Sequence, residues 1–82
     1  MKISDSVVFR EEDSIIFNQL NGSILFLNRT GFIIMQLISK GFEKQKLIDT
    51  FCNQFEVNKT TFKKDLNEFI DLIKEKNILT NE

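Results

Sequence analysis

Several residue types that commonly build catalytic and metal sites are missing or rare in this chain. Among its 82 residues there is no histidine and one cysteine, Cys52. A histidine-dependent catalytic triad, an intrachain disulfide and a zinc site built on histidines or several cysteines are therefore excluded. We expect no catalytic residues, no metal and no cofactor. Cys52 lies on the apolar stripe of a predicted helix, where a free thiol packs as a small hydrophobic group.

The chain also lacks long hydrophobic segments and proline. No apolar run approaches the roughly 18 residues that a membrane span requires. The first residues, Met1 to Asp5, do not form the hydrophobic centre of a signal peptide. We therefore expect a cytoplasmic protein without a membrane partner.

Charge of one sign is not in excess either, since 11 basic residues face 12 acidic ones and the net charge is −1. Lysines between positions 44 and 64 alternate with carboxylates, which indicates a solvated mixed surface. This pattern argues against a nucleic-acid partner, which would require a basic stripe. The aromatic residues are nine Phe, with no Trp or Tyr. Phe supplies bulk without a polar group, so these rings are expected in the core and at interfaces.

The clearest local pattern is Asn21-Gly22 between two apolar runs, residues 14–20 and 23–27. This dipeptide favours a two-residue type I′ turn, in which both central residues have positive φ. The sequence therefore predicts a β-hairpin. In that register the directly opposed pairs would be Leu20 with Ser23, Gln19 with Ile24, Asn18 with Leu25, Phe17 with Phe26, Ile16 with Leu27, and Ile15 with Asn28.

Both faces of the predicted hairpin are apolar. We assign Leu25 and Leu27 to the face that covers the helices, which leaves Ile15, Phe17, Ile24 and Phe26 facing outward. Strand 23–27 becomes the edge if the first strand pairs with residues 14–20, and it carries no charge or proline to block further pairing. Either an extended peptide adds to this edge, or another strand, the N-terminus or a second copy of the chain covers it.

The remaining segments complete an α+β fold over residues 1–82, taken as one domain. Residues 7–11 form a first strand, so a three-stranded antiparallel sheet precedes three helices, as in a winged helix-turn-helix. Each helix starts between two apolar residues that can form a hydrophobic staple, at Asn28, Glu43 and Asn58. The first ends at Gly41. The predicted core is Phe32, Ile33, Met35 or Gln36, Leu37 and Ile38; Leu47, Ile48, Phe51, Cys52 and Phe55; Phe62, Leu66, Phe69, Ile70 and Ile73; and Ile78-Leu79.

The ordered set of these features resembles the PqqD-like family, also called RiPP recognition elements. The similarity covers nearly the whole chain. Its elements are the glycine-turn hairpin, Leu27-Asn28-x-Thr30-Gly31 opening a helix with Ile34 and Leu37, Gly41-x-Glu43 before a Leu47-Ile48 helix, Phe51 and Phe55, Asp65-Leu66 with Phe69 and Ile73, and Asn77-Ile78-Leu79. Two positions depart from the family pattern: Glu43 replaces a usual capping residue, and Asn77 replaces a common glycine.

This resemblance implies a function without chemistry of its own. Family members bind the leader region of a ribosomally made precursor peptide and present it to a modifying enzyme, such as a peptidase, a cyclase or a radical-SAM enzyme. The leader would add as a strand beside residues 23–27, in the groove with helix 58–76. The residues implied as peptide-binding are Ile24, Leu25, Phe26 and Leu27 on the strand, Phe62, Leu66 and Ile70 on the groove floor, and Lys63, Asn67 and Lys74 on a rim attracting acidic leader residues.

Two alternatives to peptide binding follow from the same features. One is a winged-helix DNA-binding regulator, since the helix arrangement is similar, although the balanced charge argues against it. The other is a structural subunit that docks on a biosynthetic enzyme through the outward hairpin face. That face is equally suited to a homodimer, so a second copy of the chain is also a possible partner.

Overall fold

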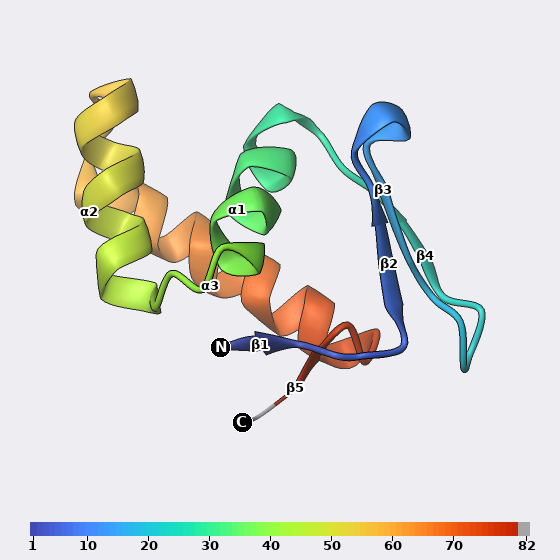
Figure 1. The fold of residues 1–82 in the computed structure, drawn as a ribbon. Coiled ribbons are helices and arrows are strands. Elements are labelled where there is room, and N and C mark those ends of the chain that lie inside the picture. Colours follow the sequence, from blue (N-terminus) through green and yellow to red (C-terminus); the bar gives the residue numbers. More distant parts are fainter. Residues whose placement is uncertain (81–82) are drawn as a thin grey trace.

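The computed structural model describes residues 1–80. A three-stranded antiparallel sheet of order β2-β3-β4 precedes three helices, which confirms the predicted α+β fold. The strands are β2 (Val7–Arg10), β3 (Ile15–Asn18) and β4 (Ile24–Phe26), and a 3₁₀ turn at Glu11–Asp13 joins the first two. The helices are α1 (Arg29–Ser39), α2 (Lys44–Phe55) and α3 (Lys59–Glu75). Helix α1 lies between the sheet and α2, and α3 crosses behind it (Figure 1).

A second, two-stranded sheet was not predicted. Strand β1 (Lys2–Ile3) pairs antiparallel with β5 (Leu79–Thr80), so the described ends of the chain lie side by side (Figure 1). The N-terminal ammonium also contacts the Glu43 carboxylate at 3.1 Å. Strands of two residues carry too little periodicity to be recognised in a sequence.

The helix starts follow the capping residues. The Asn28 side chain accepts a hydrogen bond from the Gly31 N–H at 2.8 Å, and Asn58 accepts one from the Thr61 N–H at 3.1 Å. Glu43 precedes α2 without a side-chain cap, in line with its low capping preference. Gly41 and Asn77 adopt positive φ, at 92° and 59°, so both act as helix stops.

The core lies where the helices meet the inner face of the sheet. Fully buried side chains come from β3, all three helices and the segment before β5: Ile16, Ile34, Met35, Leu47, Leu66, Ile73 and Ile78. Most predicted core positions are buried or packed against this core. Ile34 is a core residue that the expected apolar stripe of α1 omitted, and Gln36 is only half-buried.

The hairpin register differs from the prediction by two residues. Ile15 lies opposite Phe26, and Phe17 lies opposite Ile24. The Asn18 N–H donates to the Ser23 carbonyl at 2.9 Å, which closes a four-residue loop over 19–22 in place of the type I′ turn. Within the loop Gly22 has positive φ and Asn21 does not. A shift of two residues preserves side-chain alternation, so the predicted faces hold: Leu25 and Leu27 pack on the core, while Ile24 and Phe26 are exposed.

Candidate functional site: the free edge of strand β4

Strand β4 forms one edge of the sheet, and no further strand within residues 1–80 pairs with it. Its bonds to β3 fall at alternate positions, as shown by Asn18 N–H to Ser23 C=O and Leu27 N–H to Ser14 C=O. Antiparallel ladders alternate in this way, so the backbone groups of the residues between point to the other side. The N–H and C=O groups of Ile24 and Phe26 therefore face the open edge.

The groove implied by the resemblance corresponds to a hollow of about 230 Å³ near the end of β4, lined by residues from the start of α1 and from α3. A Cβ built on Gly31 would lie 3.2 Å from Phe69 and 3.4 Å from Leu27, so these two side chains approach each other across the start of α1. The Asn18 Nδ2 of β3 donates to the Asn77 carbonyl at 2.8 Å, just after α3, which ties the hairpin to the end of that helix. Residues along α3 that share the flank of Phe69 are Asp65 and Leu72, at helical spacings of four and three.

The predicted strand residues lie at the groove, on two different faces. Leu25 and Leu27 are half-buried and turn toward the helices, where Leu27 lies close to Phe69. Ile24 and Phe26 point the other way, with 52% and 79% of their surface exposed. The unpaired N–H and C=O groups of the β4 edge thus lie between an inner apolar face, formed by Leu25 and Leu27, and an outer apolar face, formed by Ile24 and Phe26.

The side chains of the three predicted floor residues are buried in the core and present little surface to the groove. Phe62, Leu66 and Ile70 are 4%, 0% and 7% exposed. They support the groove from below, and Phe69, half-buried beside Leu27, provides its accessible wall.

The predicted rim residues Lys63, Asn67 and Lys74 are exposed, and their contact with a peptide stays a prediction. At about 100° per residue they lie on the flank of α3 roughly opposite Asp65 and Phe69. Both flanks of α3 border the same stripe of buried residues. The sequence pattern alone therefore does not determine which flank lies nearer to β4. Asp65 and Leu72, which the sequence reasoning did not select, occupy that flank. Leu72 could have been recognised in the sequence as a contact residue, because it is an apolar side chain outside the buried stripe of α3. Its surface is 36% exposed.

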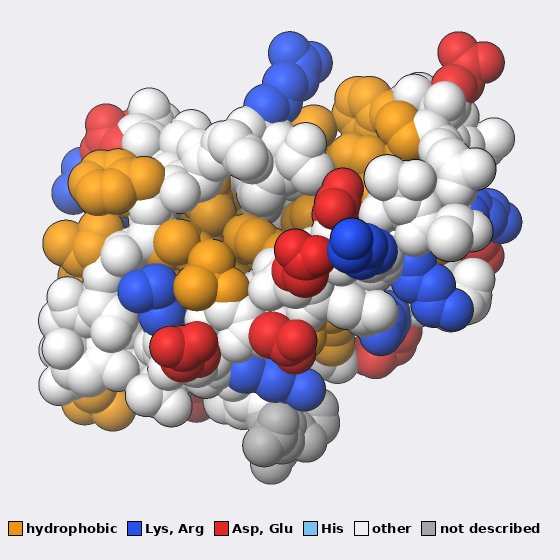
Figure 2. All heavy atoms as spheres, turned by 180° about the vertical axis from the view of Figure 1, so that it is seen from behind, with side chains coloured by type: hydrophobic (Ala, Val, Ile, Leu, Met, Phe, Trp, Pro, Cys, Tyr) orange, Lys and Arg blue, Asp and Glu red, His pale blue; other side chains and the backbone are white. Residues whose placement is uncertain are grey.

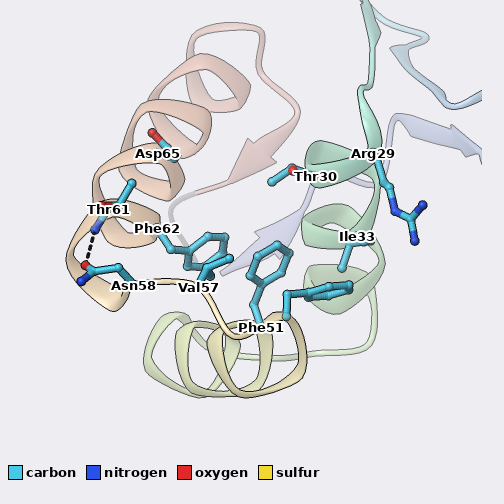
Figure 3. Close-up of a pocket in the computed structure, with 10 residues that line it drawn as sticks. Arg29, Thr30, Ile33, Phe51, Val57, Asn58, Thr61, Phe62 and Asp65 are labelled. Atoms are coloured by element: carbon cyan, nitrogen blue, oxygen red, sulfur yellow. Dashed lines mark hydrogen bonds between the residues drawn. The ribbon is translucent and has the colours of Figure 1, made fainter.

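Asp65 and the start of α1 also line two adjoining hollows. The smaller, about 230 Å³, is bordered by Asn28, Gly31, Ile34 and Phe69. The larger, about 480 Å³, opens between α1, α2 and the start of α3 (Figure 3). Thr30 and Asp65 line both hollows.

The charges near the groove are mixed. Asp65 lines both hollows, and Arg29 lines the larger one. Figure 2 shows a hydrophobic patch on the back of the molecule with both acidic and basic side chains around it. Away from the groove, the Lys59 ammonium donates a hydrogen bond to the Asp49 carboxylate at 3.1 Å and so holds the pKa of Asp49 below its usual value. That exposed pair links α2 to α3.

Within residues 1–80 no cluster of three metal-ligating side chains is present, and no helix there has the length and apolar character to cross a bilayer.

An unpaired sheet edge beside an apolar helix groove is the architecture of a peptide-binding adaptor. The chain matches the family of coenzyme PQQ synthesis protein D (PqqD) over residues 6–79, and it therefore belongs to that family. It is also similar to the solved structure of TbiB1 in complex with the TbiA(beta) leader peptide. The TM-score is 0.92 at 27% identity, over 100% of this chain and 98% of that one. No curated protein matches the chain.

Proposed function

We propose that this protein binds the leader region of a ribosomally made precursor peptide by strand addition to β4 and delivers it to a modifying enzyme. The observation that carries the proposal is the free edge of β4 beside the α3 groove. Membership of the PqqD family and the likeness to TbiB1, whose structure holds a leader peptide, support it.

The added strand would take its backbone hydrogen bonds from Ile24 and Phe26. Its side chains would alternate between two surfaces, as in any strand. Those on the inner side would enter the groove between Leu25, Leu27 and Phe69, and those on the outer side would lie next to Ile24 and Phe26. Backbone pairing gives affinity for many sequences, and the groove selects among them.

One carboxylate at the groove indicates the charge of the peptide. Asp65 lines the hollow beside Phe69, whereas the predicted rim consists of Lys63, Asn67 and Lys74. A leader with a basic residue near this position is therefore favoured over an acidic one, although an exposed pair of this kind contributes under about 1 kcal/mol.

In this proposal the protein delivers the bound precursor peptide, and the modifying enzyme carries out the chemical reaction. The outer sheet face offers the second contact, since Val8, Phe17 and Ile24 form one apolar row across it and Ile15 and Phe26 extend a second. A peptidase, a cyclase or a radical-SAM enzyme is a suitable recipient. A homodimer through this face competes with enzyme docking.

Amide hydrogen exchange, measured with and without a synthetic leader peptide, tests the mode of binding. Strand addition predicts that the Ile24 and Phe26 amides become protected on binding, whereas Leu25, already directed at β3, changes little. Binding that leaves both edge amides unprotected would rule out strand addition, and absence of binding would remove the leader-peptide function itself.

A matched pair of variants isolates the backbone contribution. Ile24→Pro and Ile24→Ala both remove the side chain, but only proline removes the edge N–H, and proline is tolerated where that group faces away from the sheet. We expect Ile24→Pro to weaken peptide binding about fivefold relative to Ile24→Ala, as one charge-neutral hydrogen bond is worth about 1 kcal/mol. Equal affinities would argue that side chains alone hold the peptide.

A further inference from the structure

We infer that the larger hollow, between α1, α2 and the start of α3, receives one large apolar side chain of the same leader peptide, from a residue outside the segment that pairs with β4. This inference rests on the proposed function and adds an anchor to it. The leader peptide would therefore need an aromatic or branched aliphatic residue outside the segment that pairs with β4.

The walls of the hollow are chemically suited to such a side chain. Figure 3 shows Phe51, Phe62 and Val57 turned toward one another from α2, α3 and the segment between them, with Ile33 of α1 on the far side. Phe51 stacks on Phe62 with ring centroids 4.1 Å apart, so the rings form a fixed surface. Val57 keeps 41% of its surface exposed at the mouth. A volume of about 480 Å³ lies within the range of sites that take an organic group.

Continuity with the β4 groove identifies the peptide as the occupant. Leu27, directly after β4, lies against Gly31, and Phe69 approaches the same glycine from α3. Gly31 and Phe69 line the smaller hollow, which shares Thr30 and Asp65 with the larger one. A path bordered by Gly31, Phe69 and the shared residues Thr30 and Asp65 therefore runs from the strand edge across the start of α1 into the hollow.

The length of this path is short enough for one peptide to reach both surfaces. Leu27 and Thr30 are three residues apart in the chain, which limits the distance between their Cα atoms to about 11 Å. An extended peptide crosses that distance in about three residues. The anchoring residue is therefore expected a few positions beyond the last residue paired with β4.

Methyl NMR of the full chain with the leader peptide tests the inference separately from the proposed function. We expect the Ile33 and Val57 methyl signals to shift on binding. Replacing one large apolar peptide residue by alanine should abolish those methyl shifts while the Ile24 and Phe26 amides stay protected. Protected edge amides with methyl signals that never move would overturn the anchor and leave strand addition standing. Loss of both readouts would overturn both.

Val57→Arg fills the mouth of the hollow, and Thr60→Arg makes the same charge change on an exposed residue that lines neither hollow. We expect Val57→Arg to weaken leader binding at least tenfold and Thr60→Arg less than twofold. Equal affinities of the two folded variants would contradict the anchor. If Val57→Arg kept peptide affinity but lost enzyme docking, the occupant would be an enzyme side chain, which also contradicts it. The Ile33 methyl readout on the unmodified chain decides the question if Val57→Arg fails to fold.

Discussion

Phe26 and Leu27 are neighbours in the chain with opposite roles. Phe26 is 79% exposed on the outer face, whereas Leu27 packs on the core beside Gly31. Strand alternation places them on opposite sides of the sheet. A charge introduced at each position therefore tests the assignment of the two faces.

We expect Phe26→Asp to weaken peptide or enzyme binding and leave the fold intact. Leu27→Asp should lower the free energy of unfolding by about 2–3 kcal/mol, because it places an unpaired carboxylate against apolar side chains. Urea unfolding and a binding titration of both variants provide the comparison. A fully stable Leu27→Asp variant, or an unfolded Phe26→Asp variant, would show that the faces are reversed.

Asn18 is the buried polar side chain that holds the hairpin to the end of α3. It is 2% exposed, accepts hydrogen bonds from Ser6 Oγ and the Leu20 N–H, and donates one to the Asn77 carbonyl. Every polar atom of its amide thus has a partner. Such a satisfied buried group fixes one arrangement of the elements around it.

Removal of this amide should be costly. Asn18→Ala leaves the Asn77 carbonyl and the Leu20 N–H without their partner, and we expect about 2–3 kcal/mol less stability in urea unfolding. Asn21→Ala is the matched control, since Asn21 is exposed and accepts a single bond from the Ser23 N–H. A change at Asn18 no larger than that at Asn21 would contradict a structural role.

Among the elements, the helices illustrate how far local sequence determines structure. Asn28 and Asn58 each satisfy a backbone N–H at their helix start, and Glu43 does not. We expect Asn28→Ala and Asn58→Ala to cost about 1 kcal/mol each in thermal or urea unfolding. Glu43→Ala should cost less than about half of that, as it loses only an exposed ion pair with the N-terminus. A cost at Glu43 that equals the other two would refute this ranking.

The sequence predicted the order and type of the main elements because capping residues and apolar periodicity act locally. It was insufficient where distant groups decide. The hairpin register depends on Asn18, whose partners Ser6 and Asn77 lie 12 and 59 positions away. The choice of α3 flank depends on the approach of Phe69 to Gly31 and Leu27. No pattern within α3 distinguishes Lys63 from Asp65 in this respect.

For the whole molecule, charge separates the peptide-binding function from the DNA-binding alternative. The net charge is −1, and acidic and basic side chains both surround the hydrophobic patch in Figure 2. Nucleic-acid affinity depends mainly on neutralised phosphates. We expect the protein to elute from heparin at low salt. Strong retention at about 0.3 M salt, where phosphate contacts are already much weakened, would restore the alternative.

The pairing of β1 with β5 has a consequence for the covalent chain. Lys2 lies opposite Thr80, so the pairing already brings residues 2 and 80 together, away from the β4 edge. Cyclisation of the backbone through a short linker would add a covalent connection next to strands β1 and β5, which are already paired. The folded state would change little, while the unfolded chain would lose conformational freedom. Such a ring should melt at a higher temperature than the linear chain and keep its peptide affinity.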